Sequence, residues 1–153
     1  MSHVAVVKVN IRSLEALDRA CRALGLELRL GQKTFRWYGS WQRAYHQAAA
    51  AAPNAIDPAL YGRCEHAVSV PNDTEAYEVG VVNNSSGEGF VMAFDSFDPC
   101  RRMVDKVGQD CGLLAQEYAA QVAEMEAQEL ISQGWQIQRV VQPNGDLQVV
   151  LTQ

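Results

Sequence analysis

The chain has 153 residues, of which 48% are apolar and 20% charged, and its formal net charge is −5. This length and composition fit one domain with a buried core, so residues 1–153 are expected to form a single domain. The acidic balance argues against general nucleic-acid binding, because such binding depends on neutralising phosphates with Lys and Arg. The opening residues lack the features of a signal peptide, and no apolar run reaches the ~20 residues of a membrane span, so a cytoplasmic protein is expected.

The N-terminal part predicts a strand, a helix and a second strand. Val and Ile recur through residues 3–11 on both parities, which favours a central strand. Ser13 stands where an N-cap is expected, and an apolar stripe at helical spacing over residues 14–24 ends before Gly25. Apolar and charged residues alternate over residues 26–30, which indicates a half-buried strand.

The middle of the chain predicts an insertion, a short strand and a hairpin. Residues 44–60 are rich in alanine and fit either a short helix or a flexible insertion. Residues 66–71 indicate a brief strand. Two strand-like runs, residues 76–84 and 89–97, flank turn-forming residues and therefore predict a β-hairpin.

The C-terminal part predicts helices followed by a second hairpin. Asp98 and Pro99 are suitable N-cap and N1 residues, and residues 113–133 show a helical pattern. Residues 135–152 contain two strand-like runs around QPNG, a strong hairpin signal. The whole order indicates an α+β fold: an antiparallel or mixed sheet, two main helices packed on one face, and a C-terminal β-hairpin.

Several stretches resemble one protein family: MSHVAVVKVNIRSLEALDRACRALGLEL, QKTFRWYGSW, GRCEHAVSVP, YEVGVV and GWQIQRVVQPNGDLQVVL. The chain resembles, over residues 1–43 and 62–152, an uncharacterised family of small proteins shared by cyanobacteria, algal plastids (as a hypothetical chloroplast reading frame) and tailed phages. KTFRWYG and GRCEHA look most like the phage-borne members. The resemblance implies an α+β fold and a small intracellular or phage-encoded accessory protein, and it implies no activity and no residue roles. Family members often lie beside ATPase genes, which points to an ATPase as a partner.

The stretch KTFRWYGSWQ, residues 33–42, is the strongest candidate for a binding surface. On an extended segment Phe35 and Trp37 face one side while Arg36 and Tyr38 face the other, and Trp41 can serve either. Aromatic faces beside an arginine suit planar bases and their phosphates, and they also suit protein interfaces. The predicted ligand-binding residues are Arg36, Tyr38, Trp41, His66, Arg101 and Arg102.

The last two of these residues follow Asp98 and Pro99 at an expected helix N-terminus. The helix dipole attracts anions there, and Arg101 and Arg102 would strengthen that attraction. The alternative is two solvated arginines.

Catalytic chemistry has weaker support. Cys64, Glu65 and His66 lie together, and on an extended segment Cys64 and His66 would face the same side, but their spacing fits no zinc motif and no third group is marked to orient a dyad. Ser40 with His46 is no better supported. We assign no catalytic residue, no metal ligand and no cofactor, and we expect the four cysteines to be reduced. The carboxylates of Glu75, Glu78, Asp95 and Asp98 are expected to be exposed charges at strand ends.

The sequence therefore favours a non-enzymatic, phage-type accessory protein that sequesters a small nucleotide-derived ligand, with counter-defence as the expected role. A homodimer could enclose such a ligand between its subunits. The alternative is a protein–protein adaptor or inhibitor that acts on an ATPase or a host defence protein. A third hypothesis is a small metal-dependent or hydrolytic enzyme.

Overall fold

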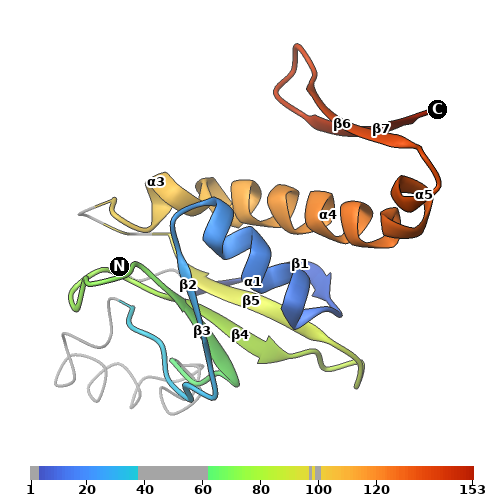
Figure 1. Ribbon diagram of the computed structural model, residues 1–153. Helices are drawn as coiled ribbons and strands as arrows, with labels where there is room; N and C mark the ends of the chain where they lie inside the picture. Colours follow the sequence, from blue (N-terminus) through green and yellow to red (C-terminus); the bar gives the residue numbers. More distant parts are fainter. Residues whose placement is uncertain (1–3, 38–61, 97, 99–100) are drawn as a thin grey trace, which may run out of the picture.

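The computed structural model of the chain describes residues 4–37, 62–96, 98 and 101–153, so the predicted insertion at 44–60 lies outside the described residues. The fold is α+β, as predicted: a five-stranded antiparallel sheet, helices on one of its sides, and a separate C-terminal hairpin (Figure 1). The described elements are β1 (Val4–Ile11), α1 (Leu14–Ala23), β2 (Glu27–Leu30), β3 (His66–Ser69), β4 (Val79–Asn83), β5 (Phe90–Asp95), α3 (Val104–Val107), a 3₁₀ turn (Gln109–Cys111), α4 (Gly112–Glu126), α5 (Gln128–Ser132), β6 (Gln136–Val141) and β7 (Leu147–Thr152). None of these helices is long and apolar enough to cross a membrane.

The five-stranded sheet has the order β1-β5-β4-β3-β2, and all neighbouring strands are antiparallel. The hairpin of β4 and β5 confirms the prediction for residues 76–97. The prediction that the first strand is central is wrong, because β1 pairs only with β5 among the described strands and forms one edge. At the other edge, β2 buries less than its alternation predicted, since Leu30 at its end is 66% exposed.

Helix α1 begins and ends as its sequence predicts. The side chain of Ser13 accepts a hydrogen bond from the backbone N–H of Ala16, at 3.0 Å, which is a regular N-cap. The buried face of α1 includes Leu17 and Cys21, which pack in the main core with residues of the sheet and of α4. Tyr118 of α4 fixes the turn before α1, because its hydroxyl accepts hydrogen bonds from the backbone N–H groups of Arg12 and Ser13.

The first helix after β5 begins later than predicted. Helix α3 starts only at Val104, and its N-cap residue is Met103, not Asp98. The Oδ2 of Asp98 accepts from the backbone N–H groups of Met103 and Val104 at 3.1 and 3.3 Å. The prediction of a helix opening at Asp98 is therefore wrong, and Pro99 lies outside the described residues. The predicted helix over residues 113–133 is divided into α4 and α5 at Ala127.

The sheet face turned away from the main core accommodates two aromatic side chains. Three small residues, Ala67, Gly80 and Ala93, lie side by side on β3, β4 and β5 and form a shallow shelf. Phe35 and Trp37 are only 4% and 6% exposed, and both pack in a second apolar cluster with Ala67 and Ala93. The small side chains of the shelf leave space for the two aromatic rings. A Cβ atom on Gly80, for example, would lie only 2.5 Å from the Phe35 ring. The prediction that Phe35 and Trp37 face the same side is confirmed, and that side is buried.

The C-terminal hairpin confirms the second hairpin prediction and lies apart from the five-stranded sheet, beyond α4 (Figure 1). Its turn is closed by hydrogen bonds from Gln142 N–H to Asp146 O and from Gly145 N–H to Gln142 O, and Gly145 has a positive φ of 90° that favours glycine. Arg139 of β6 connects the hairpin to α4 through ion pairs with Glu117 and Glu124.

Candidate functional site

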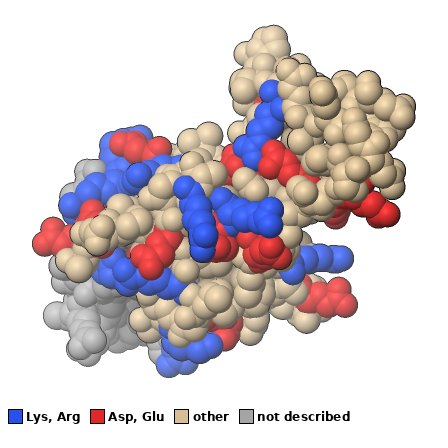
Figure 2. All heavy atoms as spheres, in the orientation of Figure 1, with Lys and Arg blue, Asp and Glu red and all other residues tan. Residues whose placement is uncertain are grey.

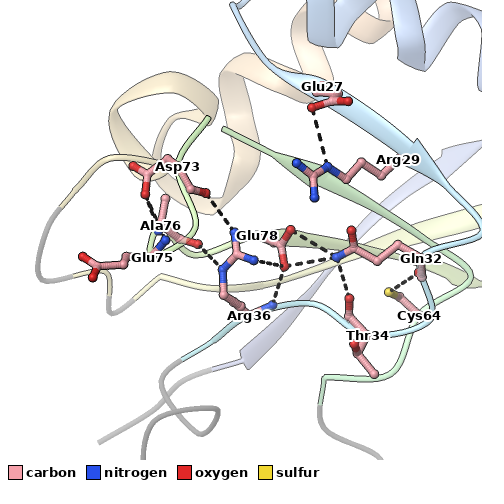
Figure 3. Close-up of polar contacts among 10 residues, drawn as sticks. All are labelled: Glu27, Arg29, Gln32, Thr34, Arg36, Cys64, Asp73, Glu75, Ala76 and Glu78. Atoms are coloured by element: carbon pink, nitrogen blue, oxygen red, sulfur yellow. Dashed lines mark hydrogen bonds and ion pairs between the residues drawn. The ribbon is translucent and has the colours of Figure 1, made fainter. Parts of the chain in front are cut away.

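A buried carboxylate lies at the centre of the polar site beside the aromatic shelf. Glu78, just before β4, is 1% exposed. Its Oε1 accepts from the backbone N–H of Arg36 at 2.9 Å, and both of its carboxylate oxygens accept from Gln32 Nε2 at 3.1 Å (Figure 3). A carboxylate this deeply buried needs such partners, because an unpaired charge in the interior is strongly unfavourable. Glu78 therefore connects the loop residues Gln32 and Arg36 to the start of β4 by hydrogen bonds.

Arg36, a predicted ligand-binding residue, is the main cationic partner of Glu78. The guanidinium lies 3.5 Å from Glu78 Oε1, and it also donates to the backbone carbonyls of Ala76 and Asp73 at 3.0 and 3.1 Å. Figure 3 shows the guanidinium lying between these three groups. Arg36 thus holds the loop before β4 in place, and a ligand would have to compete with these internal partners.

Arg102 contacts the same loop. Its guanidinium is 3.2 Å from Asp73 Oδ2 and 3.6 Å from Glu75 Oε2. The backbone N–H of Glu75, followed by that of Ala76, donates to Asp73 and holds the pKa of that carboxyl below its ordinary value. The structure therefore brings Arg36 and Arg102 together on one loop, but with three carboxylates between them, which gives this cluster an excess of negative charge.

The other described residues of the predicted site lie elsewhere. Arg101 pairs with Asp105 on the exposed side of α3, at 3.1 Å. His66 begins β3, where its Nδ1 accepts from the backbone N–H of Gly31 at 2.9 Å and its ring meets the edge of Phe90. Tyr38 and Trp41 lie outside the described residues.

The chemistry proposed for Cys64, Glu65 and His66 does not fit their geometry. Cys64 packs in the apolar cluster of the shelf, whereas His66 contacts Phe90, which packs against the main core on the other face of the sheet. The expectation that they face the same side is therefore wrong. Burial, together with the charges of Glu78 and Glu65, raises the pKa of Cys64 to about 11, so the thiol is protonated at neutral pH.

Glu65, the remaining acid of that group, is engaged by a lysine. Its Oε2 lies 2.7 Å from Lys33 Nζ, and this hydrogen bond lowers the pKa of Glu65. Within the described part of the chain, no three His, Cys, Asp or Glu side chains are grouped so that they could hold a metal ion.

The carboxylates that were expected at the surface are mostly buried. Glu75 is exposed, but Glu78, Asp95 and Asp98 are buried, so the expectation fails for these three. The sequence itself contained an indication that Glu78 is buried. It stands in the run AYEVGVV, which is apolar on both parities and therefore typical of a strand covered on both faces, and a lone glutamate there requires a buried partner.

A second candidate surface is formed by the hairpin. Val140, Val141 and Leu151 are exposed, and Val141 is 70% exposed. In Figure 2 the lobe at the upper right, where Figure 1 places the hairpin, is almost free of charged side chains, whereas blue and red atoms cover the body of the molecule. An exposed, uncharged, partly apolar surface of this kind is typical of protein interfaces.

A groove of about 660 Å³ adjoins this surface, between the hairpin turn and the start of α4. Its lining includes Gln109, Leu113, Gln116 and Asn144, and its charged side chain is Asp146. Amides and leucines suit a polypeptide segment, whereas an aspartate opposes a phosphate. The groove therefore extends the hairpin surface without adding a site for an anion.

Comparisons of the chain with models of protein families, with curated proteins and with solved structures find no match. The family resemblance therefore stays a prediction, and the function has to be inferred from the residues themselves.

Proposed function

We propose that this chain is a non-enzymatic protein–protein adaptor or inhibitor that binds its partner through the C-terminal hairpin. The observation that supports the proposal is the exposure of Val140, Val141 and Leu151 on a lobe that is nearly free of charge. Interface centres are depleted of charged residues and enriched in apolar ones. In the setting that the family resemblance implies, we expect the partner to be an ATPase or a host defence protein.

The hairpin is suited to this role because it is held by the rest of the molecule. Val141 and Leu151 lie on the same face of the hairpin as Arg139, and Val140 lies on the opposite face. A two-stranded hairpin alone is only marginally stable in water. Here Arg139 turns toward α4 and bonds Glu117 through both carboxylate oxygens, at 2.8 and 2.9 Å. The hydrogen bond with Glu124, ahead of that with Glu117, raises the pKa of Arg139. The hairpin is thus anchored by Arg139, while Val140, Val141 and Leu151 stay exposed.

We favour the adaptor over sequestration of a nucleotide because the arginines predicted to bind the ligand already form ion pairs with carboxylates. Arg36, Arg101 and Arg102 each form an ion pair with at least one carboxylate. A phosphate would have to displace those carboxylates and would meet their negative charge. By contrast, a protein docking on the hairpin displaces no internal ion pair.

The test compares two exposed apolar positions of similar exposure. Val141 on the hairpin is 70% exposed, and Leu30 at the edge of the main sheet is 66% exposed. We expect an affinity-tagged chain to retain the same protein from a lysate of its host cells as wild type and as Leu30→Ser, but not as Val141→Ser. Retention of that protein by the wild type and by both variants would show that the hairpin is not the docking surface.

Sequestration of a nucleotide-derived ligand remains the second candidate, because Arg36 and Arg102 meet at the loop around Asp73. Native mass spectrometry of the chain purified from its host cells distinguishes the two. A retained nucleotide that is absent from Arg102→Gln would support sequestration, and a retained protein without a small molecule would support the adaptor.

A further inference from the structure

We propose that two copies of this chain join through strand β7, which pairs antiparallel with β7 of the second copy to form a four-stranded sheet. The inference goes beyond the proposed function, since it names a second copy of the chain as a partner of the hairpin and does not require an outside protein. It depends on the hydrogen-bonding groups along the strand edges, on the register that they permit, and on the distribution of charge.

The free edges of the described strands differ in how well they are protected. Proteins usually protect an edge strand with charged residues, bulges or short length, because its unpaired N–H and C=O groups can pair with another chain. Strand β2 has only four residues and carries Glu27 and Arg29, and β1 has a register shift between Val7 and Ile11. Strand β6 carries Arg139. Strand β7, LQVVLT, has no charge, no proline and no register shift. Its sequence therefore protects it least among the described edges, and the helix packed against it is α4.

The turn determines which backbone groups of β7 point outward. Gln142 and Asp146 are a hydrogen-bonded pair at the end of the hairpin. Pairs alternate along an antiparallel ladder, so Gln148 and Val150 bond to β6, whereas Leu147, Val149 and Leu151 direct their N–H and C=O groups away from it. Among the described residues no other strand pairs with this edge. These outward groups are therefore available to a second strand.

A second copy of β7 matches this edge in register. If Val149 lies opposite the same residue of the second copy, then Leu147 lies opposite Leu151 in both directions. Each outward N–H then meets an outward C=O, and apolar side chains lie opposite apolar side chains on the same face. The arrangement has a twofold axis and closes on itself, as most homodimers do. Self-pairing of β6 would instead bring Arg139 close to its own copy.

The charge distribution also favours this contact between two copies. Each chain has a formal net charge of −5, so two copies repel one another. The hairpin contains one cation and one anion, Arg139 and Asp146, and hence has no net charge. A contact through the hairpins keeps the acidic bodies apart, beyond much of the ~8–10 Å range of electrostatic repulsion at physiological salt. Arg139 adds little repulsion, because Glu117 and Glu124 already neutralise it.

This pairing is compatible with the proposed docking surface. Strand β6 would become an outer strand of the four-stranded sheet at each end, and Val140 and Val141 would stay accessible there. Leu151 would lie in the contact between the two β7 strands, so the dimer would present the β6 part of the docking surface, Val140 and Val141, twice. This increases apparent affinity for any partner that has two binding sites.

The test uses proline, which removes a backbone N–H and is tolerated on an edge strand where that N–H faces solvent. Val149→Pro removes an outward N–H of β7, and Val141→Pro, the matched control, removes an outward N–H of β6. Sedimentation equilibrium of the purified chain at about 1–200 μM should show wild type and Val141→Pro associating to twice the chain mass, with the dissociation constant of Val149→Pro raised at least ~10-fold. Circular dichroism checks that each variant is folded.

A second variant covers the case in which the proline disturbs the hairpin. Residues opposite each other in a hydrogen-bonded antiparallel pair have Cα atoms about 5.5 Å apart, which a disulfide can bridge. Val149→Cys should therefore form a disulfide-linked dimer under mild oxidation, and Val141→Cys and the wild-type chain should not. A wild-type chain that is monomeric throughout, or cross-linking by Val141→Cys but not by Val149→Cys, would overturn the inference. A monomer that still retains its partner protein would leave the proposed function standing.

Discussion

Glu78 is a single charged residue that determines the course of two loops. It accepts from the backbone of Arg36 and from the side chain of Gln32, two residues that flank the segment leading onto the aromatic shelf. A backbone N–H and a guanidinium from the same residue meet one carboxylate oxygen. The loop before β4 therefore depends on the negative charge at this position.

Substitution of Glu78 by glutamine should be strongly destabilising. The amide has the same shape, but it accepts at only one position and leaves Arg36 without its anionic partner. We expect Glu78→Gln to lower the free energy of unfolding by about 2–4 kcal/mol. Urea unfolding measures this loss, with Glu75→Gln as the control, since Glu75 is exposed and should change the value by less than about 0.5 kcal/mol. Equal small losses for both variants would contradict the role of Glu78.

The buried thiols predict a specific loss of stability in alkali. Burial raises the pKa of Cys64 to about 11 and those of Cys21 and Cys111 to about 12, from 9.0. A thiol whose pKa is raised on folding contributes stability fully below its unfolded pKa and loses that contribution as the pH rises through its folded pKa. The free energy of unfolding should therefore fall between about pH 9 and 12, and more gradually in Cys111→Ala than in wild type. Identical pH profiles of the two proteins would show that the Cys111 thiol does not contribute to the loss of stability in alkali.

At the level of elements, local sequence patterns predicted most boundaries, and long-range pairing determined the rest. Ser13 and the QPNG turn form hydrogen bonds with residues only a few positions away, so the local sequence is sufficient to predict the helix start and the turn. The position of β1 at an edge is different, since it depends on which distant strand pairs beside it. The pairing of Arg36 with Glu78, 42 residues apart, is likewise invisible to periodicity, although the lone glutamate in an apolar run indicated that a partner exists.

Substitution of Gly80 tests whether the aromatic residues pack on the shelf. An added Cβ would lie 2.5 Å from two atoms of the Phe35 ring, which is only 4% exposed. We expect Gly80→Ala to destabilise the protein by about 1–3 kcal/mol, the usual range for overpacking a core. Gly112→Ala is the control, because Gly112 begins α4 with no atom near its added Cβ, and alanine there should be neutral or stabilising by up to about 1 kcal/mol. Thermal unfolding of the two variants gives the comparison, and a stable Gly80→Ala would show that Phe35 is not held against β4.

For the whole molecule, the main consequence of the fold is a division between a well-packed sheet and a lightly attached hairpin. The sheet has a core on each of its faces, formed with α1 and α4 on one side and with Phe35 and Trp37 on the other. The hairpin has no other described strand beside it and depends on α4. A surface held in this way can serve binding without endangering the fold, because its apolar residues contribute little to the core.

Arg139 provides the test of this division. Its bonds to Glu117 and Glu124 are the ion pairs that join the hairpin to α4. If the hairpin opens separately from the sheet, Arg139→Ala should raise hydrogen exchange at β6 and β7 by about tenfold and leave β4 and β5 unchanged, because local openings need only their own contacts to break. Arg22→Ala, which removes an exposed ion pair with Asp18 on α1, is the control and should change neither region. The measurement is made on dilute protein, so that pairing between copies does not protect β7. Equal acceleration in the hairpin and the sheet would mean that the two parts unfold as one cooperative unit, and the hairpin could not then adapt to a partner independently of the core.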